Sequence, residues 1–213
     1  MIKLTEATTT SSFQRLRMRA ATPAVACAAL VLGSLGLANA QESGEACKME
    51  KISDQKTVAF PTAFAAAEKR AHEWQRDAVV VRLVQTALGP IDAEARSANW
   101  YMVFYSPSAK KRIAVTIANG FISCWQDSEK PGRLPVLAGD VYRDVKQLLA
   151  TAAAKGGAAL MQKGAQPTVE LSAGSEVAGY RGLWFVNYRA NGGGSLQVTF
   201  DGCTGKFEKA IGD

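Results

Sequence analysis

The sequence has few of the residues that catalysis and metal binding most often use. His72 is the only histidine among 213 residues, and it lies on the flank of a predicted helix, where we expect it to be solvated. The chain has no CxxC, HxxxH or HExxH pattern, so a tetrahedral zinc site would need almost all of its soft ligands. G-x-S-x-G, P-loop and G-x-G-x-x-G motifs are absent as well. We therefore expect no metal site, no cofactor and no catalytic residue.

The sequence also lacks a hydrophobic run long enough to cross a bilayer. Its most apolar stretch, residues 20–36, is interrupted by polar residues, glycine and proline, whereas a spanning helix needs about 20 apolar residues. Three arginines within 15–19 precede this stretch, and Ala-Asn-Ala at 38–40 follows it. This order is typical of a secretory signal peptide. We expect cleavage before Gln41, no membrane span afterwards, and a periplasmic or secreted protein.

No strong charge of one sign remains after signal removal. Lys3 and the three arginines against Glu6 account for +3 of the formal +6. The remaining Lys and Arg alternate with Asp and Glu, and a nucleic-acid-binding protein needs a concentrated basic face. We therefore expect no nucleic-acid partner. At 47% hydrophobic residues, the chain can bury a core.

Apolar spacing and turn residues predict an α+β fold. The expected organisation is a signal peptide at 1–40, an N-terminal lead-in at 41–59, a first α+β unit at 60–126, a linker at 127–139 and a second α+β unit at 140–213. In each of the two tandem units, one helix would pack on an antiparallel sheet of about four strands.

The predicted helices follow from periodicity and the strands from alternation and β-branched residues. Phe60, Phe64, Ala67 and Ala71 form one helical face, and Asp140 is a candidate cap for the second helix. Strands are expected at residues 78–84, 100–105, 113–117, 121–125, 168–171, 183–188, 195–200 and 206–210. A loop is expected from about residue 87 to 98, and hairpin turns at 119–120, 191–194 and 203–205.

The two predicted units match each other at an offset of 83 residues. Tyr101 falls on Trp184, and Val115 falls on Val198. The other matched pairs are Val103 with Val186, Tyr105 with Tyr188, Ile113 with Leu196, Thr116 with Thr199 and Ile117 with Phe200. Self-similarity of this kind predicts that one small unit occurs twice.

Three cysteines remain in the expected mature chain: Cys47, Cys124 and Cys203. An oxidising compartment favours one disulfide and leaves one cysteine over, as a buried thiol, an intermolecular bridge or a reactive group. Three pairings are open. Cys47 with Cys124 is slightly favoured because that bridge closes the first unit on itself.

Two groups of residues are candidates for binding. Large aromatic residues in the predicted strands are Trp100, Tyr101, Tyr105, Trp184 and Tyr188, and a basic hairpin tip contains Lys110, Lys111 and Arg112. Aromatic residues are favoured anchors in protein interfaces, and a basic tip suits an acidic partner. Packing of unit against unit and a solvated turn are the alternative interpretations.

The end of the chain resembles a PepSY-type module. Its last hairpin reads Val198-Thr199-Phe200-Asp201, followed by the turn Thr204-Gly205. The first unit has a similar pattern but carries Asn119-Gly120 in place of Thr-Gly. The resemblance implies an exported, noncatalytic module that inhibits a peptidase or binds a partner at the cell envelope.

Three functions follow as hypotheses. The first is an exported binding protein of PepSY type, which holds a protein partner of the envelope or secreted fraction. The second is binding of a small ligand in a cleft between the units, lined by Trp100, Tyr101, Trp125 and Trp184. The third is a thiol-dependent enzyme or redox protein, which would need a cysteine with a depressed pKa.

Overall fold

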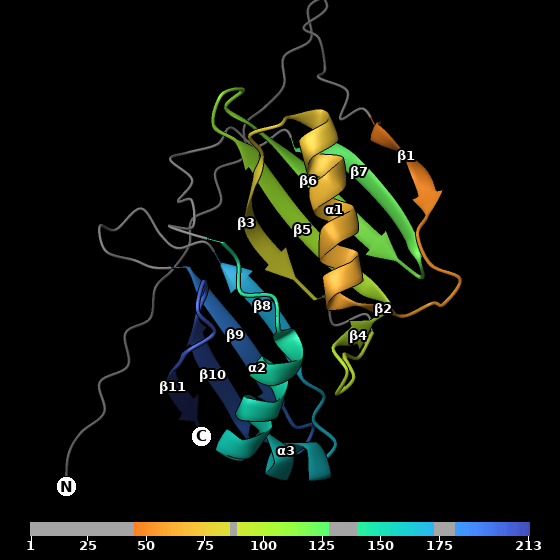
Figure 1. Ribbon diagram of the computed structural model, residues 1–213. Coiled ribbons are helices and arrows are strands. Elements are labelled where there is room, and N and C mark those ends of the chain that lie inside the picture. Colours follow the sequence, from red (N-terminus) through yellow and green to blue (C-terminus); the bar gives the residue numbers. More distant parts are fainter. Residues whose placement is uncertain (1–44, 86–88, 128–139, 173–181) are drawn as a thin grey trace, which may run out of the picture. The chain divides into compact units, whose positions relative to one another are not determined.

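Nine strands of this protein form one antiparallel sheet (Figure 1). The computed structural model describes residues 45–85, 89–127, 140–172 and 182–213, so the predicted signal peptide and nearly all of the predicted linker lie outside the described residues. The strands, in spatial order, are β1 (Glu45–Lys51), β7 (Phe121–Asp127), β6 (Lys111–Ala118), β5 (Asn99–Ser106), β3 (Val79–Val84), β8 (Thr168–Ser172), β9 (Leu183–Arg189), β10 (Ser195–Asp201) and β11 (Phe207–Gly212). The short strands β2 (Val58–Ala59) and β4 (Arg96–Ser97) pair with each other.

The prediction of two tandem units, each a helix on its own sheet, is wrong. β3 and β8 pair antiparallel, with Leu83 opposite Leu171, so strands of both expected units belong to one continuous sheet. In two separate sheets, β3 and β8 would each leave a row of backbone donors and acceptors unpaired. Their pairing satisfies these groups. The helices are short beside this sheet, and the fold is mainly β.

Helix α1 (Phe60–Trp74) begins and ends close to the predicted residues. Pro61 lies in its first turn, where a missing N–H costs nothing. Phe60, Phe64 and Ala67 are buried against the sheet, as their spacing predicts. Figure 1 shows α1 lying across the face of the sheet formed by β5, β6 and β7.

The second helical segment is broken into three pieces: α2 (Val145–Ala152), the π-helical turn η1 (Ala153–Gly157) and α3 (Ala158–Gln162). The residue that caps its N-terminus is Asp144, so the prediction of Asp140 as the helix cap is wrong. The Asp144 carboxylate accepts a hydrogen bond from the Gln147 backbone N–H at 2.9 Å. Gly156 has φ +121°, a conformation that glycine adopts at little cost, and this residue bends the segment.

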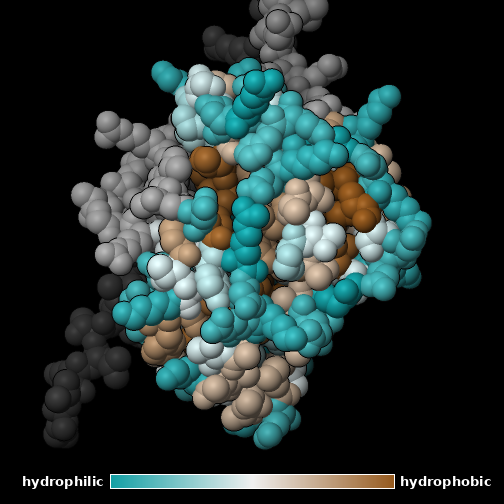
Figure 2. Space-filling view, viewed as in Figure 1, coloured by the Kyte–Doolittle hydropathy of each residue, from teal (hydrophilic) through white to brown (hydrophobic). Residues whose placement is uncertain are grey.

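The core lies between the helices and one face of the sheet. Trp100 of β5 and Trp184 of β9 both pack on Phe60, with ring centroids 5.3 and 5.6 Å away. The Trp100 indole N–H donates a hydrogen bond to the Val58 carbonyl at 3.0 Å. Space-filling Figure 2 shows this helix-bearing side, where hydrophilic side chains surround separate hydrophobic hollows.

The internal match shifts by one residue between strands. Trp100 and Trp184 are equivalent in the two hairpins, because Trp100 pairs with Ile117 and Trp184 pairs with Phe200. That equivalence gives an offset of 84 in the first strand of each hairpin, while Ile117 and Phe200 keep the offset of 83. A one-residue slip exchanges the two faces of a strand. The predicted match of Tyr101 with Trp184 therefore compares residues on opposite faces.

Strand β1 lies within the segment interpreted as a lead-in. It pairs with β7, and the predicted disulfide between Cys47 and Cys124 is confirmed, with 5.3 Å between the two Cα atoms. The bridge closes a sequence separation of 77 residues. It fixes the outermost strand to the sheet.

Candidate functional site

The predicted aromatic site residues lie on two different faces of the sheet. Trp100, Trp184 and Tyr188 are buried in the main core on the helix side. Tyr101 and Tyr105 alternate with Trp100 along the chain and lie on the other face, half-buried. The three core residues offer no exposed surface to a partner. The structure also does not bring Trp100, Tyr101, Trp125 and Trp184 into one pocket.

The face turned away from α1 carries a hydrophobic cluster of its own. Val81 and Val103 are buried in it, and Tyr101 and Tyr105 pack against them. Trp125 adds to it from β7, with its ring centroid 6.3 Å from that of Tyr101 and its side chain 36% exposed. We call these five residues the open sheet face. In the described part of the chain, no helical residue belongs to this cluster.

A β-bulge supplies one member of the open sheet face. The register between β3 and β5 shifts between Val80 and Arg82, so Val81 is an extra residue in β3. Val80 packs in the main core and Val81 packs in the second cluster. Bulges re-aim side chains in this way. The continuous β-branched run at 79–81 carries no sequence signal for it.

Basic residues border the open sheet face. Arg112 lies opposite Tyr105 in the sheet register, and Arg82 forms an ion pair with Glu170 at 3.4 Å. Lys110 and Lys111 are exposed at the tip of the β5–β6 hairpin, as predicted. This side of the molecule therefore combines aromatic rings with cations.

Asp77 holds the basic hairpin tip in place. Its carboxylate accepts hydrogen bonds from the Ser106 hydroxyl at 2.7 Å and from the Ser108 backbone N–H at 2.8 Å. These hydrogen bonds lower the pKa of Asp77 from its ordinary value, with the Ser106 bond the largest cause. The position of Lys110 and Lys111 is thus set by a side chain in the turn just before β3.

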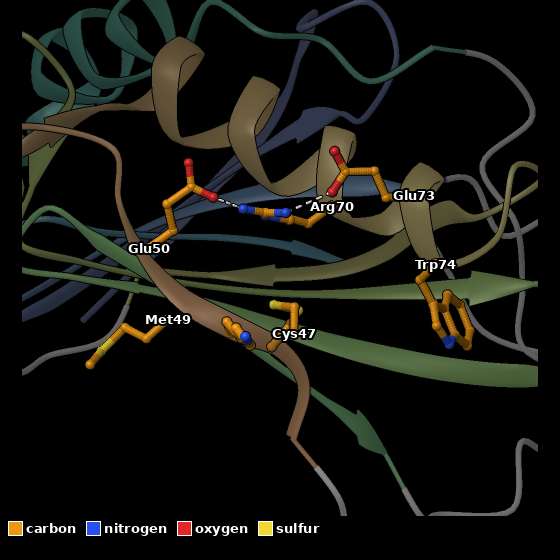
Figure 3. A pocket seen from close by; sticks show the side chains of 8 residues that line it. Cys47, Met49, Glu50, Arg70, Glu73 and Trp74 are labelled. Carbon is orange, nitrogen blue, oxygen red and sulfur yellow. Dashed lines mark hydrogen bonds and ion pairs between the residues drawn. A yellow bond between two sulfur atoms is a disulfide. The ribbon is translucent and has the colours of Figure 1, made fainter.

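A separate pocket of about 550 Å³ lies between α1 and β1 (Figure 3). Arg70 reaches from α1 toward Glu50 on β1, and the Cys47–Cys124 disulfide forms part of the wall. Trp74 lines the same pocket from the last turn of α1. Sequence reasoning gave no signal for this pocket because β1 was not expected to be a strand.

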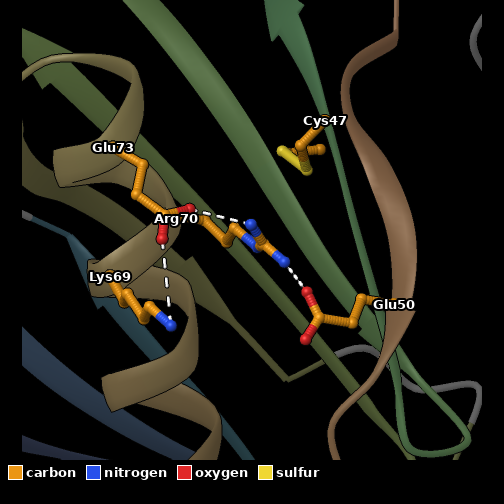
Figure 4. A network of polar contacts seen from close by, with 6 residues as sticks. Cys47, Glu50, Lys69, Arg70 and Glu73 are labelled. Atoms are coloured by element: carbon orange, nitrogen blue, oxygen red, sulfur yellow. Dashed lines mark hydrogen bonds and ion pairs between the residues drawn. A yellow bond between two sulfur atoms is a disulfide. The ribbon is translucent and has the colours of Figure 1, made fainter.

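The charges around Arg70 balance one another (Figure 4). Arg70 pairs with Glu50 and, at 2.8 Å, with Glu73, which in turn lies 3.8 Å from Lys69. Two cations thus face two carboxylates. The network connects α1 to the edge strand, and exposed ion pairs of this kind contribute little to stability.

The turn that suggested a PepSY-type module is organised by Asp201. One of its carboxylate oxygens accepts hydrogen bonds from the backbone N–H of Cys203 at 3.1 Å and of Thr204 at 2.8 Å, and from the Thr204 hydroxyl at 2.8 Å. Gly205 follows with φ +68°. Cys203, the cysteine outside the Cys47–Cys124 bridge, is half-buried in this turn. The motif therefore has a structural role as a turn.

His72 and the acidic residues form no metal-binding group. The His72 ring nitrogen Nε2 lies 3.1 Å from the Ala78 carbonyl oxygen, where it connects the end of α1 to β3. Within residues 45–85, 89–127, 140–172 and 182–213, no cluster of three or more His, Cys, Asp or Glu side chains is placed to hold a metal ion. None of the helices in these ranges has the length and apolarity of a membrane span.

Comparison with known proteins gives a structural similarity but no matching family model. No family model and no curated protein matches the chain. A crystal structure of a protein from Clostridium difficile 630, described as a "putative lipoprotein", is similar with a TM-score of 0.42 and 12% sequence identity. The match covers 76% of this chain and 96% of the other. The PepSY-type resemblance thus stays a prediction.

Proposed function

We propose that this protein is an exported, noncovalent binding protein, and that the open sheet face is where it holds a protein partner. The observation that carries the proposal is the second hydrophobic cluster outside the main core: Tyr101 and Tyr105 pack against Val81 and Val103, and Trp125 lies beside Tyr101. Sheet faces that meet only water usually carry polar side chains. Partly buried tyrosine and tryptophan rings are typical anchors of protein interfaces.

The partner surface should be apolar at its centre and acidic at its border. Tyr105 lies next to the hairpin tip, where the side chains of Lys110 and Lys111 are exposed. Acidic side chains on the partner would find these cations close to the aromatic anchors. Such charges mainly raise the association rate and orient the partner. A peptidase is the partner class that the PepSY-type resemblance implies.

Two features support an extracytoplasmic place of action. The first 40 residues have the order of a signal peptide. The Cys47–Cys124 disulfide belongs to oxidising compartments, where such bonds form and persist.

The test uses the chain from Gln41 onward as bait for proteins of the producer's envelope and secreted fractions. The captured protein is then purified, and its affinity is measured for the wild type and for Tyr105→Ala and Trp125→Ala. We expect each substitution to weaken binding at least about tenfold, as the loss of an interface anchor does. If the partner is a peptidase, the same variants should lose inhibition in parallel.

The matched control is Met49→Ala. Met49 is 66% exposed and lines the Arg70 pocket, and it does not belong to the open sheet face. Its truncation to alanine should therefore leave the affinity for the partner unchanged. Circular dichroism establishes that all variants are folded. Equal affinities for the wild type, Tyr105→Ala and Trp125→Ala would show that the open sheet face is not the binding surface.

A further inference from the structure

A second pocket, of about 320 Å³, lies between the β3–β5 connection and the helices α2 and α3. Its lining includes Ile91, Leu149, Ala153, Met161, Pro167 and Tyr188. Small-molecule sites are mostly apolar, and this volume is at the lower end of their range. The pocket shares no lining residue with the Arg70 pocket or with the open sheet face.

Tyr188 brings a polar group to this apolar lining. Its side chain is 2% exposed, and its hydroxyl has no hydrogen-bond partner among the residues that the structure describes. Burial raises the pKa of Tyr188 to about 12, so the hydroxyl keeps its proton at any physiological pH. The hydroxyl is not one of the fully enclosed polar atoms without a partner, and Tyr188 lines the pocket, so a bound molecule with an acceptor can take its hydrogen bond.

The charged side chains around the pocket already have partners. Lys146 Nζ lies 2.6 Å from Glu94 Oε2, and the two charges neutralise each other. One carboxylate oxygen of Asp92 accepts hydrogen bonds from the backbone N–H of Glu94 at 2.9 Å and of Arg96 at 2.8 Å. A charged ligand would have to break these contacts. The pocket therefore presents one available hydrogen-bond donor, and its one lysine is already paired, while Asp92 keeps a negative charge that is held by backbone N–H groups.

The position of the Tyr188 hydroxyl is set by the break in the second helical segment. At Gly157, a Cβ atom would collide with the hydroxyl end of the Tyr188 ring. Only a residue without a side chain lets η1 approach the ring this closely. Ala153, in the same π-helical turn, lines the pocket beside Tyr188. The π-helical turn η1 thus fixes both the Tyr188 ring, through Gly157, and the pocket wall, through Ala153.

We propose that this pocket binds a small neutral molecule with an apolar body and one hydrogen-bond acceptor, and that the acceptor takes the hydrogen bond of the Tyr188 hydroxyl. The apolar lining selects the body, and an anion would find Lys146 already paired and Asp92 repelling it. Tyr188 selects a carbonyl or similar oxygen. This site is independent of the open sheet face.

The test compares acetophenone with ethylbenzene, which has the same ring but lacks the carbonyl oxygen. Both are titrated into the chain labelled with ¹³C at its methionine methyl groups. We expect acetophenone to shift the Met161 resonance saturably while that of Met49, outside the pocket, stays in place. Ethylbenzene should bind about three- to tenfold more weakly, the effect of one hydrogen bond.

Two variants make the outcome specific. Tyr188→Phe keeps the ring and should erase the difference between the two probes. Ala153→Leu should fill the pocket and weaken both probes at least tenfold, while the thermal unfolding of each variant shows that it is folded. Equal affinity of the wild type for both probes, or an unchanged Met161 shift in Ala153→Leu, would overturn the proposal.

Discussion

The Asp77 carboxylate controls the shape of the basic hairpin tip through two hydrogen bonds. Its pKa is lowered in the folded protein, so its stabilisation is fully present above its unfolded pKa and is lost as the pH falls through the lower, folded pKa. We expect Asp77→Asn to lower the free energy of unfolding at neutral pH, and the difference from the wild type to shrink below about pH 4. Urea unfolding from pH 2.5 to 7 measures it.

The control for this pH dependence is Glu208→Gln. Glu208 is an exposed carboxyl on β11, far along the sheet from the β5–β6 tip. Glu208→Gln removes an exposed carboxyl that makes no contact with the hairpin tip, so it should change the free energy of unfolding little. A difference between Asp77→Asn and the wild type that persists unchanged at low pH would mean that the ionised carboxylate is not what holds the tip.

Gly205 and Gly193 form a matched pair for backbone strain. Both have positive φ, +68° and +96°, but an added Cβ at Gly205 would lie 2.5 Å from the Tyr142 ring, whereas at Gly193 it would meet nothing within 4 Å. We expect Gly193→Ala to destabilise by about 1 kcal/mol, the cost of the conformation alone. Gly205→Ala should cost roughly 1–3 kcal/mol more, because overpacking adds to it. Chemical denaturation of both variants measures the two losses of unfolding free energy. Equal losses would contradict the close contact between Gly205 and the Tyr142 ring.

At the level of elements, the disulfide determines whether β1 stays in the sheet. We expect the double variant Cys47→Ser, Cys124→Ser to lose about 4 kcal/mol of unfolding free energy, because the bridge closes a separation of 77 residues. Amide protons of β7 that pair with β1 should also exchange faster. Hydrogen exchange of β10, at the other end of the sheet, is the internal control. Unchanged β7 protection would show that backbone pairing alone retains β1.

The elements with strong sequence patterns were predictable. Phe60, Phe64 and Ala67 at helical spacing predict α1, and the positive φ of Asn119 and Gly120 fulfils the predicted turn. Strand β1 was not predictable, because Glu45–Lys51 has no β-branched residue and no alternation. It is a strand because β7 and the disulfide hold it there. The sequence also could not decide which residue caps α2, because Asp140 and Asp144 are equally suitable by residue type.

For the whole molecule, one continuous sheet predicts one unfolding transition. Phe60 contacts both Trp100 and Trp184, and β3 pairs with β8, so neither half keeps its core without the other. We expect Val198→Ala, buried near the C-terminal end, to lower the unfolding midpoint seen by probes in either half equally. Hydrogen exchange near Val115 and near Val186 checks this. Two separate transitions would indicate that the halves fold independently.

The continuity of the sheet could not be deduced from residue types. Pairing of β3 with β8 uses backbone groups, which every residue carries, so no side-chain pattern predicts it. The faces were also ambiguous, because β5 is apolar on both sides at Trp100, Tyr101 and Met102. This ambiguity hid the one-residue slip and placed core residues among the candidate binding residues. The open sheet face became visible only when the register was known.

The charged strand β1 has a further consequence for solubility. It contributes Lys48, Glu50 and Lys51 at one edge of the sheet, and charged edges resist the addition of strands from other molecules. The strand behind it, β7, presents Phe121, Ile122 and Trp125 with no charge before its last residue. If the disulfide is reduced and β1 leaves, this apolar strand becomes the new edge. The bond therefore also protects the protein against aggregation, which makes folding in a reducing cytosol hazardous.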